Sequence, residues 1–157
     1  MNYTIWKINK AEIDILKEFL YEVIFIPEGE EKPNKDIIEL PEFQLYIKDF
    51  GNSYGDLCLV AEVSNKIVGA VWTRIVNDYG HIDDNTPSLV ISHLKDYRGQ
   101  GIGSNLMKKM FILLKDEGFN NVSLSVQKAN YATKMYKKLG FEVYCEKSEE
   151  LIMNKKL

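Results

Sequence analysis

Apolar residues recur along this chain at two different spacings, which predict where strands and helices form. Alternation of apolar and polar positions predicts strands at Tyr3–Ile8, Leu57–Val63, Ile67–Val76 and Val122–Val126. Three residues separate the second and third of these strands, few enough for an antiparallel hairpin. The short apolar run at Leu89–Leu94 predicts a strand that is buried on both faces.

Apolar residues three and four positions apart predict helices between these strands. The strongest stripe lies at Gly103–Glu117, whose lysines fall mostly on the outer side. Helices are also predicted at Lys10–Val23 and Ala132–Leu139. A helical segment at Lys35–Asp49 should be interrupted near Pro41.

The order of these elements predicts an α/β fold, a mixed sheet with helices on its faces. Phe141–Cys145 and Leu151–Met153 would complete a sheet of six to seven strands. The 157 residues suit a single domain, expected to span residues 1–157. No apolar run reaches the roughly 20 residues of a membrane span, and the start lacks the pattern of a signal peptide. We therefore expect a cytoplasmic protein.

Charge is nearly balanced overall but unevenly distributed. The chain has 20 Lys and Arg against 23 Asp and Glu, which speaks against a nucleic-acid partner. Between Glu28 and Asp56, however, eight acids face only three lysines. Such a run is most commonly a solvated surface. The alternative is an acidic rim that attracts a cationic substrate.

The segment Tyr97–Ser104 carries the clearest chemical signal. Glycines at positions 99, 101 and 103 stand between a buried strand and the start of a long helix. Backbone N–H groups of such a turn can point at one anion, and the helix start adds further donors. Arg98 supplies a positive charge, so the inferred ligand is a phosphate or pyrophosphate. The glycine spacing fits neither the dinucleotide fingerprint nor a P-loop, and the structural alternative is a tight turn with no ligand.

Two motifs in this chain resemble the GNAT acetyltransferase superfamily. The run Arg98-Gly99-Gln100-Gly101-Ile102-Gly103 is similar to that superfamily's acyl-CoA pyrophosphate loop. The run Tyr136-Lys137-Lys138-Leu139-Gly140-Phe141 is similar to its tyrosine helix and Leu-Gly-Phe ending. The element order matches as well, so the resemblance covers nearly the whole chain. It implies a GNAT-like sheet in which the parallel strands Leu89–Leu94 and Val122–Val126 splay apart to form a CoA cleft.

The resemblance also implies an activity and a binding site. The activity is direct transfer of an acetyl group from acetyl-CoA to a primary amine of a small molecule or a protein. Backbone N–H groups near His93 or Leu94 would hold the oxyanion. No metal, nucleic acid or membrane is implied, and a homodimer is left open. The implied CoA-binding residues are Ile91, Ser92, His93, Leu94, Arg98, Gly99, Gln100, Gly101, Ile102, Gly103, Ser104, Asn130 and Tyr136.

Two catalytic residues are candidates, and three positions depart from the family pattern. Tyr136 is at the family's position for the acid that protonates the departing thiolate. His93 replaces a usually apolar residue, and its imidazole is either a proton acceptor or, more commonly for a strand histidine, structural. Val122–Val126 lacks the glutamate base of some relatives, so a base must come from elsewhere or from water. Ala129 stands where many members have an asparagine, and Asn130 is expected to substitute for it.

Two functions from different classes therefore stay open. Tyr136 and the glycine loop favour an acetyltransferase, whereas the missing acid and displaced asparagine favour a non-catalytic acyl-CoA sensor. The acceptor walls are expected from residues 24–49 and 77–86. Glu22 and Glu28 are candidates for the acceptor side, with solvated surface as the alternative.

Overall fold

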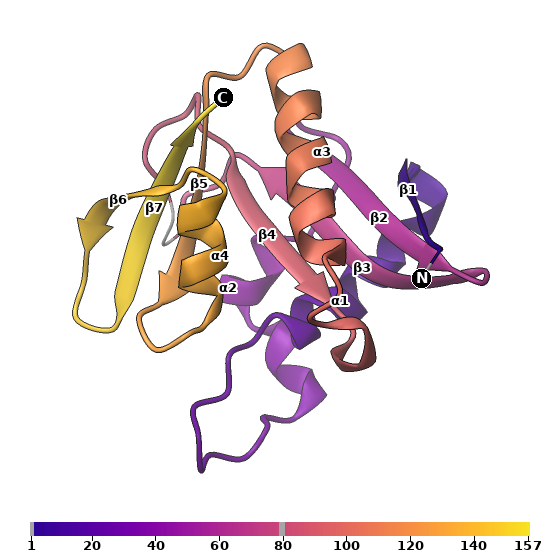
Figure 1. Ribbon diagram of the computed structural model, residues 1–157, viewed down its shortest axis with the longest axis horizontal. Coiled ribbons are helices and arrows are strands. Elements are labelled where there is room, and N and C mark those ends of the chain that lie inside the picture. The colour runs from indigo at the N-terminus through magenta and orange to yellow at the C-terminus, as the bar shows by residue number, and fades with distance from the viewer. Residues whose placement is uncertain (1, 79–80) are drawn as a thin grey trace.

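The computed structural model describes residues 2–78 and 81–157, apart from the side chains of Lys10 and Ala11 (Figure 1). In these ranges seven strands form one mixed sheet with the order β1-β2-β3-β4-β5-β7-β6. All neighbours are antiparallel except β4 and β5. This confirms the predicted fold class. The strands are β1 (Thr4–Lys7), β2 (Leu57–Val63), β3 (Lys66–Arg74), β4 (Ser88–His93), β5 (Asn121–Gln127), β6 (Glu142–Glu146) and β7 (Glu150–Lys156).

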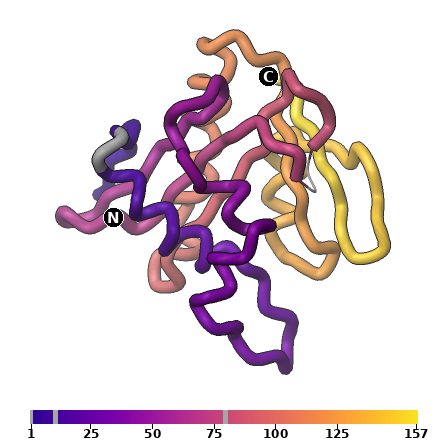
Figure 2. The backbone as a smooth tube through the Cα atoms, turned by 180° about the vertical axis from the view of Figure 1, so that it is seen from behind, coloured from indigo at the N-terminus to yellow at the C-terminus, as the bar shows by residue number. Residues whose placement is uncertain are grey.

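Helices cover both faces of the sheet. The long α3 and the short α4 lie on one face (Figure 1), and the segment that contains α1 and α2 crosses the other (Figure 2). Among the described residues, three short 3₁₀ helices, η1 to η3, precede α1, α2 and α3. The helices are η1 (Lys10–Ile15), α1 (Leu16–Glu22), η2 (Lys35–Glu39), α2 (Pro41–Gln44), η3 (Lys95–Tyr97), α3 (Ile102–Asp116) and α4 (Ala132–Lys138).

Each face of the sheet has its own hydrophobic core. Leu89 and Ile91 of β4 join the core under α3, whereas Val90 packs into the core under α1. Because successive side chains of a strand point to opposite faces, β4 is buried on both sides, as its apolar pattern predicts. The strand is thereby fixed between two layers of helices.

The local predictions hold with two exceptions. The helical segment predicted at Lys35–Asp49 ends at Gln44, and the chain continues as turns. The β2–β3 hairpin is present, and Ser64 and Asn65 of its turn have positive φ angles of 48° and 66°. The predicted α-helix from Lys10 is wrong for its first six residues, which form η1. Asn9 precedes them but makes no side-chain capping bond, and Glu12 N–H donates to Asn9 O in a tighter i to i+3 turn.

A buried ion pair fastens the loop after α2 to β3. Arg74 donates from Nε and Nη2 to the two carboxylate oxygens of Asp56, both at 3.0 Å. The Asp56 side chain is 0% exposed. Arg74 Nη1 also donates to the carbonyl oxygens of Leu45 and Lys48. One guanidinium thus holds the chain from residue 45 to residue 56 against the sheet.

Replacing Asp56 by alanine should destabilise the fold strongly. The Arg74 guanidinium would stay buried without its carboxylate, which typically costs about 3–5 kcal/mol. Denaturant unfolding followed by circular dichroism measures this loss. As a control, Glu146→Gln breaks the exposed Lys128–Glu146 pair and should leave the midpoint unchanged. Equal midpoints for Asp56→Ala and the native chain would contradict the anchoring role of Arg74.

Candidate active site

The sheet opens between its two parallel strands. A single residue pair, Ser88 with Ser123, joins β4 to β5. Next to it, Ser123 N–H donates to Pro87 O at 2.9 Å. From this vertex toward their C-terminal ends, the strands separate (Figure 1). The vertex and the two diverging strands make the splay that the resemblance implies.

Backbone groups of β4 point into this gap. Leu94 N–H donates to Val68 O at 2.8 Å, which makes His93 and Gly69 a non-hydrogen-bonded pair of the β3–β4 ladder. By alternation, the backbone N–H and C=O groups of Ile91 and His93 then face away from β3, toward β5. The Leu94 N–H is already used in the ladder, so of the two expected oxyanion donors the His93 N–H is the one that faces the gap. Ile91 and His93 are the backbone donors that border the gap.

A cavity of about 370 Å³ occupies the gap and extends to both faces of the sheet. On the α3 and α4 face it is lined by Ile91, Val126 and Tyr136. On the opposite face it is lined by Leu20 and Phe43, among others. A molecule that enters beside α3 can therefore reach the side of the sheet covered by α1 and α2.

The glycine loop lies at the open end of the splay, where the chain runs from β4 to α3. Gly99 and Gly101 have φ angles of 74° and 83°, a left-handed conformation that favours glycine. Gly101 is the N-cap of α3, so the first N–H groups of a fifteen-residue helix follow directly. Arg98 Nε donates to His93 O at 3.3 Å, and its Nη2 lies 3.7 Å from a carboxylate oxygen of Glu22. This geometry suits an anion at the helix start.

The predicted CoA-binding residues fall into three groups, of which one, at the end of β4, consists of Ser92, His93 and Leu94 and does not line the cavity. Ile91, Asn130 and Tyr136 line the cavity, whereas the side chains of residues 98–104 lie outside it, on the loop and helix start. Asn130 Oδ1 accepts a hydrogen bond from Ala132 N–H at 2.9 Å and so caps α4. Ser92 points to the other face, where its buried hydroxyl has no partner among the described residues.

Tyr136 is a buried phenol beside the cavity. Its side chain is 8% exposed and meets Phe141 edge-on, with ring centroids 5.9 Å apart. Burial raises the pKa of Tyr136 to about 12. The phenol is therefore protonated at neutral pH and can donate a proton or a hydrogen bond toward the cavity.

His93 does not line the cavity. Its side chain lies on the α3 face, where a Cβ built on Gly103 would stand 3.6 Å from Nε2. Burial, and then the nearby Arg98 charge, lowers the pKa of His93. The imidazole thus packs under the start of α3, and only the backbone of His93 borders the gap.

Sequence reasoning missed the carboxylate that lies closest to the vertex. Asp78 lines the cavity and accepts a hydrogen bond from Ser88 Oγ at 2.9 Å. Of the acidic residues 28–56, Glu42 lines the cavity and Glu28 does not. Glu22, the other candidate for the acceptor side, also lies outside the cavity lining and pairs with Lys32 and Arg98. The only sequence signal for Asp78 is its place in the expected acceptor wall, shared with other acids of that loop.

Comparison with known proteins identifies the family. The family model described as "Acetyltransferase (GNAT) family" matches residues 18–141. The chain belongs to the GNAT acetyltransferase family. The match runs from α1 to Phe141, three residues beyond the end of α4, and so includes the splay, the glycine loop and Tyr136.

Relatives of this GNAT chain include two curated proteins. The probable N-acetyltransferase camello of Xenopus tropicalis is 35% identical over 86 residues, 53% of this chain and 37% of that protein. The ribosomal protein bS18 alanine N-acetyltransferase of Haemophilus influenzae is 31% identical over 91 residues, 58% of this chain and 57% of that protein. The matched regions thus cover less than two thirds of either relative.

Solved structures show the same fold over the whole GNAT chain. The PaiA N-acetyltransferase of Thermoplasma acidophilum, solved with coenzyme A, superposes with a TM-score of 0.74 at 22% identity. The alignment covers 100% of both chains. Within residues 2–78 and 81–157, no helix is both long and apolar enough to cross a membrane. The same residues contain no group of three or more His, Cys, Asp or Glu side chains placed to hold a metal ion.

Replacing Gly101 by glutamate should abolish CoA binding in a folded protein. The new carboxylate would stand at the start of α3, where it would repel a pyrophosphate. Gly29 offers a matched control, because its φ of 85° and its open surroundings resemble those of Gly101. Both substitutions carry similar backbone strain, of about 1–2 kcal/mol, but only Gly101→Glu should lose binding by calorimetry. Unchanged CoA affinity in folded Gly101→Glu would remove the phosphate assignment.

Proposed function

We propose that this protein transfers an acetyl group from acetyl-CoA directly to a primary amine. The observation that carries the proposal is the open splay of β4 and β5, with a cavity that extends through the sheet beside the buried phenol of Tyr136. Family membership supports the reaction class. Bound acetyl-CoA supplies the activated acetyl thioester.

The residues present fit acetyl-CoA. The Gly99–Gly101 turn and the first N–H groups of α3 offer donors to a pyrophosphate, and Arg98 adds a positive charge. The backbone of Ile91 and His93 offers amide partners to an extended arm in the gap. These sites follow one another along the chain from the gap to the helix start.

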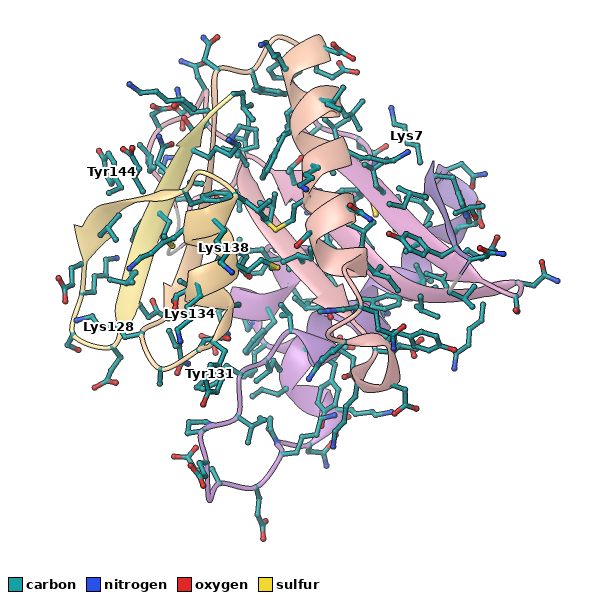
Figure 3. All side chains as sticks on the ribbon, in the orientation of Figure 1. Lys7, Lys128, Tyr131, Lys134, Lys138 and Tyr144 are labelled. Carbon is teal, nitrogen blue, oxygen red and sulfur yellow. The ribbon has the colours of Figure 1, made fainter. Side chains whose placement is uncertain are left out.

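Charge is divided between the two faces of the sheet. α4 carries three lysines and no acid, and Figure 3 shows Lys134 and Lys138 on its outer surface, on the same side of the sheet as α3. On the opposite face, Glu42 and Asp78 contribute carboxylates to the cavity lining. This division suits an anionic donor on the α3 face and a cationic acceptor on the α1 face.

Tyr136 acts as the general acid in this proposal. Its protonated phenol borders the cavity, and it makes no hydrogen bond to another described residue that would occupy its proton. It donates that proton to the departing sulfur. A non-catalytic sensor would need neither this phenol nor a carboxylate beside the vertex, so both residues favour the enzyme.

The Tyr136→Phe variant should lower kcat by about 100-fold or more while acetyl-CoA affinity holds. The substitution keeps the ring against Phe141 and removes only the donor. Steady-state kinetics at a pH where chemistry limits the rate measures the effect. Tyr131→Phe is the matched control, because Tyr131 lies just before α4 and is 85% exposed. Near-normal kcat in Tyr136→Phe would show that water or another group, and not Tyr136, protonates the departing sulfur.

A panel of amines should show faster turnover of cationic acceptors than of neutral or anionic ones at low salt. Salt screens the field of the acidic lining, so the preference should shrink as ionic strength rises. Release of free thiol from acetyl-CoA measures turnover for each amine. A preference for anionic acceptors would refute the cationic class, and CoA binding without turnover of any amine would favour the sensor.

A further inference from the structure

We propose that Asp78 is the catalytic base that takes the proton from the acceptor amine, an inference that rests on the proposed acetyl transfer. The expected base position on β5 is empty of acids, because that strand reads Asn121-Val122-Ser123-Leu124-Ser125-Val126-Gln127. A carboxylate must therefore reach the cavity from another element, and Asp78 does so from the segment after β3.

Hydrogen bonds place Asp78 at the vertex of the splay. Its Oδ1 accepts from Ser88 Oγ at 2.9 Å. Ser88 is also the β4 residue that pairs with β5, so the carboxylate lies next to the point where the strands meet. The side chain of Tyr46 makes a second hydrogen bond to the Asp78 carboxylate. Both partners are neutral hydroxyl groups, which leave the negative charge available to an ammonium group.

The backbone of Tyr46 is itself held in place. Trp72, fully buried in β3, donates from Nε1 to Tyr46 O at 3.2 Å. Arg74 fastens the carbonyl groups of Leu45 and Lys48 on either side. The sheet therefore fixes the Tyr46 backbone, and through the Tyr46 side chain it supports the orientation of Asp78.

The surroundings of Asp78 suit a proton acceptor. Burial raises the pKa of its carboxyl group, while the hydrogen bonds from Ser88 and Tyr46 and the charge of His81 act in the opposite direction. A carboxylate with a raised pKa holds a transferred proton better than a solvated one does. Glu42 and Glu150 line the same cavity, but Glu42 is exposed at its rim. Glu150 pairs with Gln127, at the far end of β5 from the vertex.

The proton balance closes with two groups of this chain. Asp78 takes one proton from the ammonium form of the acceptor, whose nitrogen then bonds to the acyl carbon as the carbon–sulfur bond breaks. Tyr136 gives its proton to the sulfur and recovers one from the newly acylated nitrogen. Asp78 releases its proton to water, so the products are the acetamide, free CoA thiol and one proton.

The Asp78→Asn variant tests the assignment, because it keeps the shape and an acceptor oxygen for Ser88 but removes the base. We expect kcat for a cationic amine to fall about 100-fold or more, with CoA affinity and melting temperature unchanged. Native activity should decline as pH falls through the pKa of Asp78. The pH profile of the variant should no longer show the decline that follows the pKa of Asp78. Its rate should instead rise with pH as the amine itself loses its proton. Asp116→Asn, at the exposed C-terminal end of α3, should keep native kcat.

A second acceptor separates a base from a structural role. An amine whose pKa lies well below the assay pH is already neutral, so Asp78→Asn should slow its acetylation by only a few-fold. An equal loss for both amines, or native kcat with the cationic amine, would overturn the proposal. If Asp78→Asn is unfolded, Asp78→Ser at the same site is measured against the same two amines. Absence of turnover by the native chain with every amine would instead refute the acetyl transfer itself, and the base with it.

Discussion

The site depends on one defect in the sheet, the failure of β4 and β5 to pair beyond a single residue pair. Buried backbone groups without partners cost about 1–3 kcal/mol each, so such a gap persists only where water or a ligand reaches them. Each half of the sheet is complete without the missing ladder, because β4 is fully paired with β3 and β5 with β7. The gap therefore separates two parts of the sheet, β1–β4 and β5–β7, each of which has its own complete hydrogen-bonded ladders.

Helices α3 and α4 pack on opposite sides of the gap and so set the distance between the two halves of the sheet. α3 packs on β2, β3 and β4, on one side of the gap. Tyr136 of α4 packs with Phe141 and shares the core of β5 on the other side. Because one core joins α3 and α4, the width of the opening is set by the same side chains that stabilise the fold. The cavity is then a product of packing between rigid elements, which is a favourable basis for a site that must position two substrates.

The sequence predicts the parts of the site that depend on local pattern. The Gly99 and Gly101 turn follows from residue type, and Tyr136 follows from its helical stripe and the motif around it. The side chain of His93 could not be placed, because alternation shows that it shares a face with Ile91 but not that α3 covers this face at Gly103. The sequence could not choose between the His93 and Leu94 N–H groups, because the ladder bond from Leu94 to Val68 depends on the register of β3.

The position of Asp78 in the site could not be predicted from local sequence pattern, because it depends on how the strands pair. Arg74 ends β3 and pairs with Ser88 at the start of β4, so the connection between them begins at the vertex of the splay. By alternation, the β5 side chains that face the acceptor side are those of Asn121, Ser123, Ser125 and Gln127. Neither a serine hydroxyl nor a side-chain amide acts as a proton acceptor at neutral pH. An acidic residue at position 124, in place of Leu124, would instead point to the face occupied by Tyr136. The β3–β4 connection is thus an element that can bring an acid to the vertex from the acceptor side, and the Arg74 anchor that stabilises the fold also fixes the loop that supports this acid.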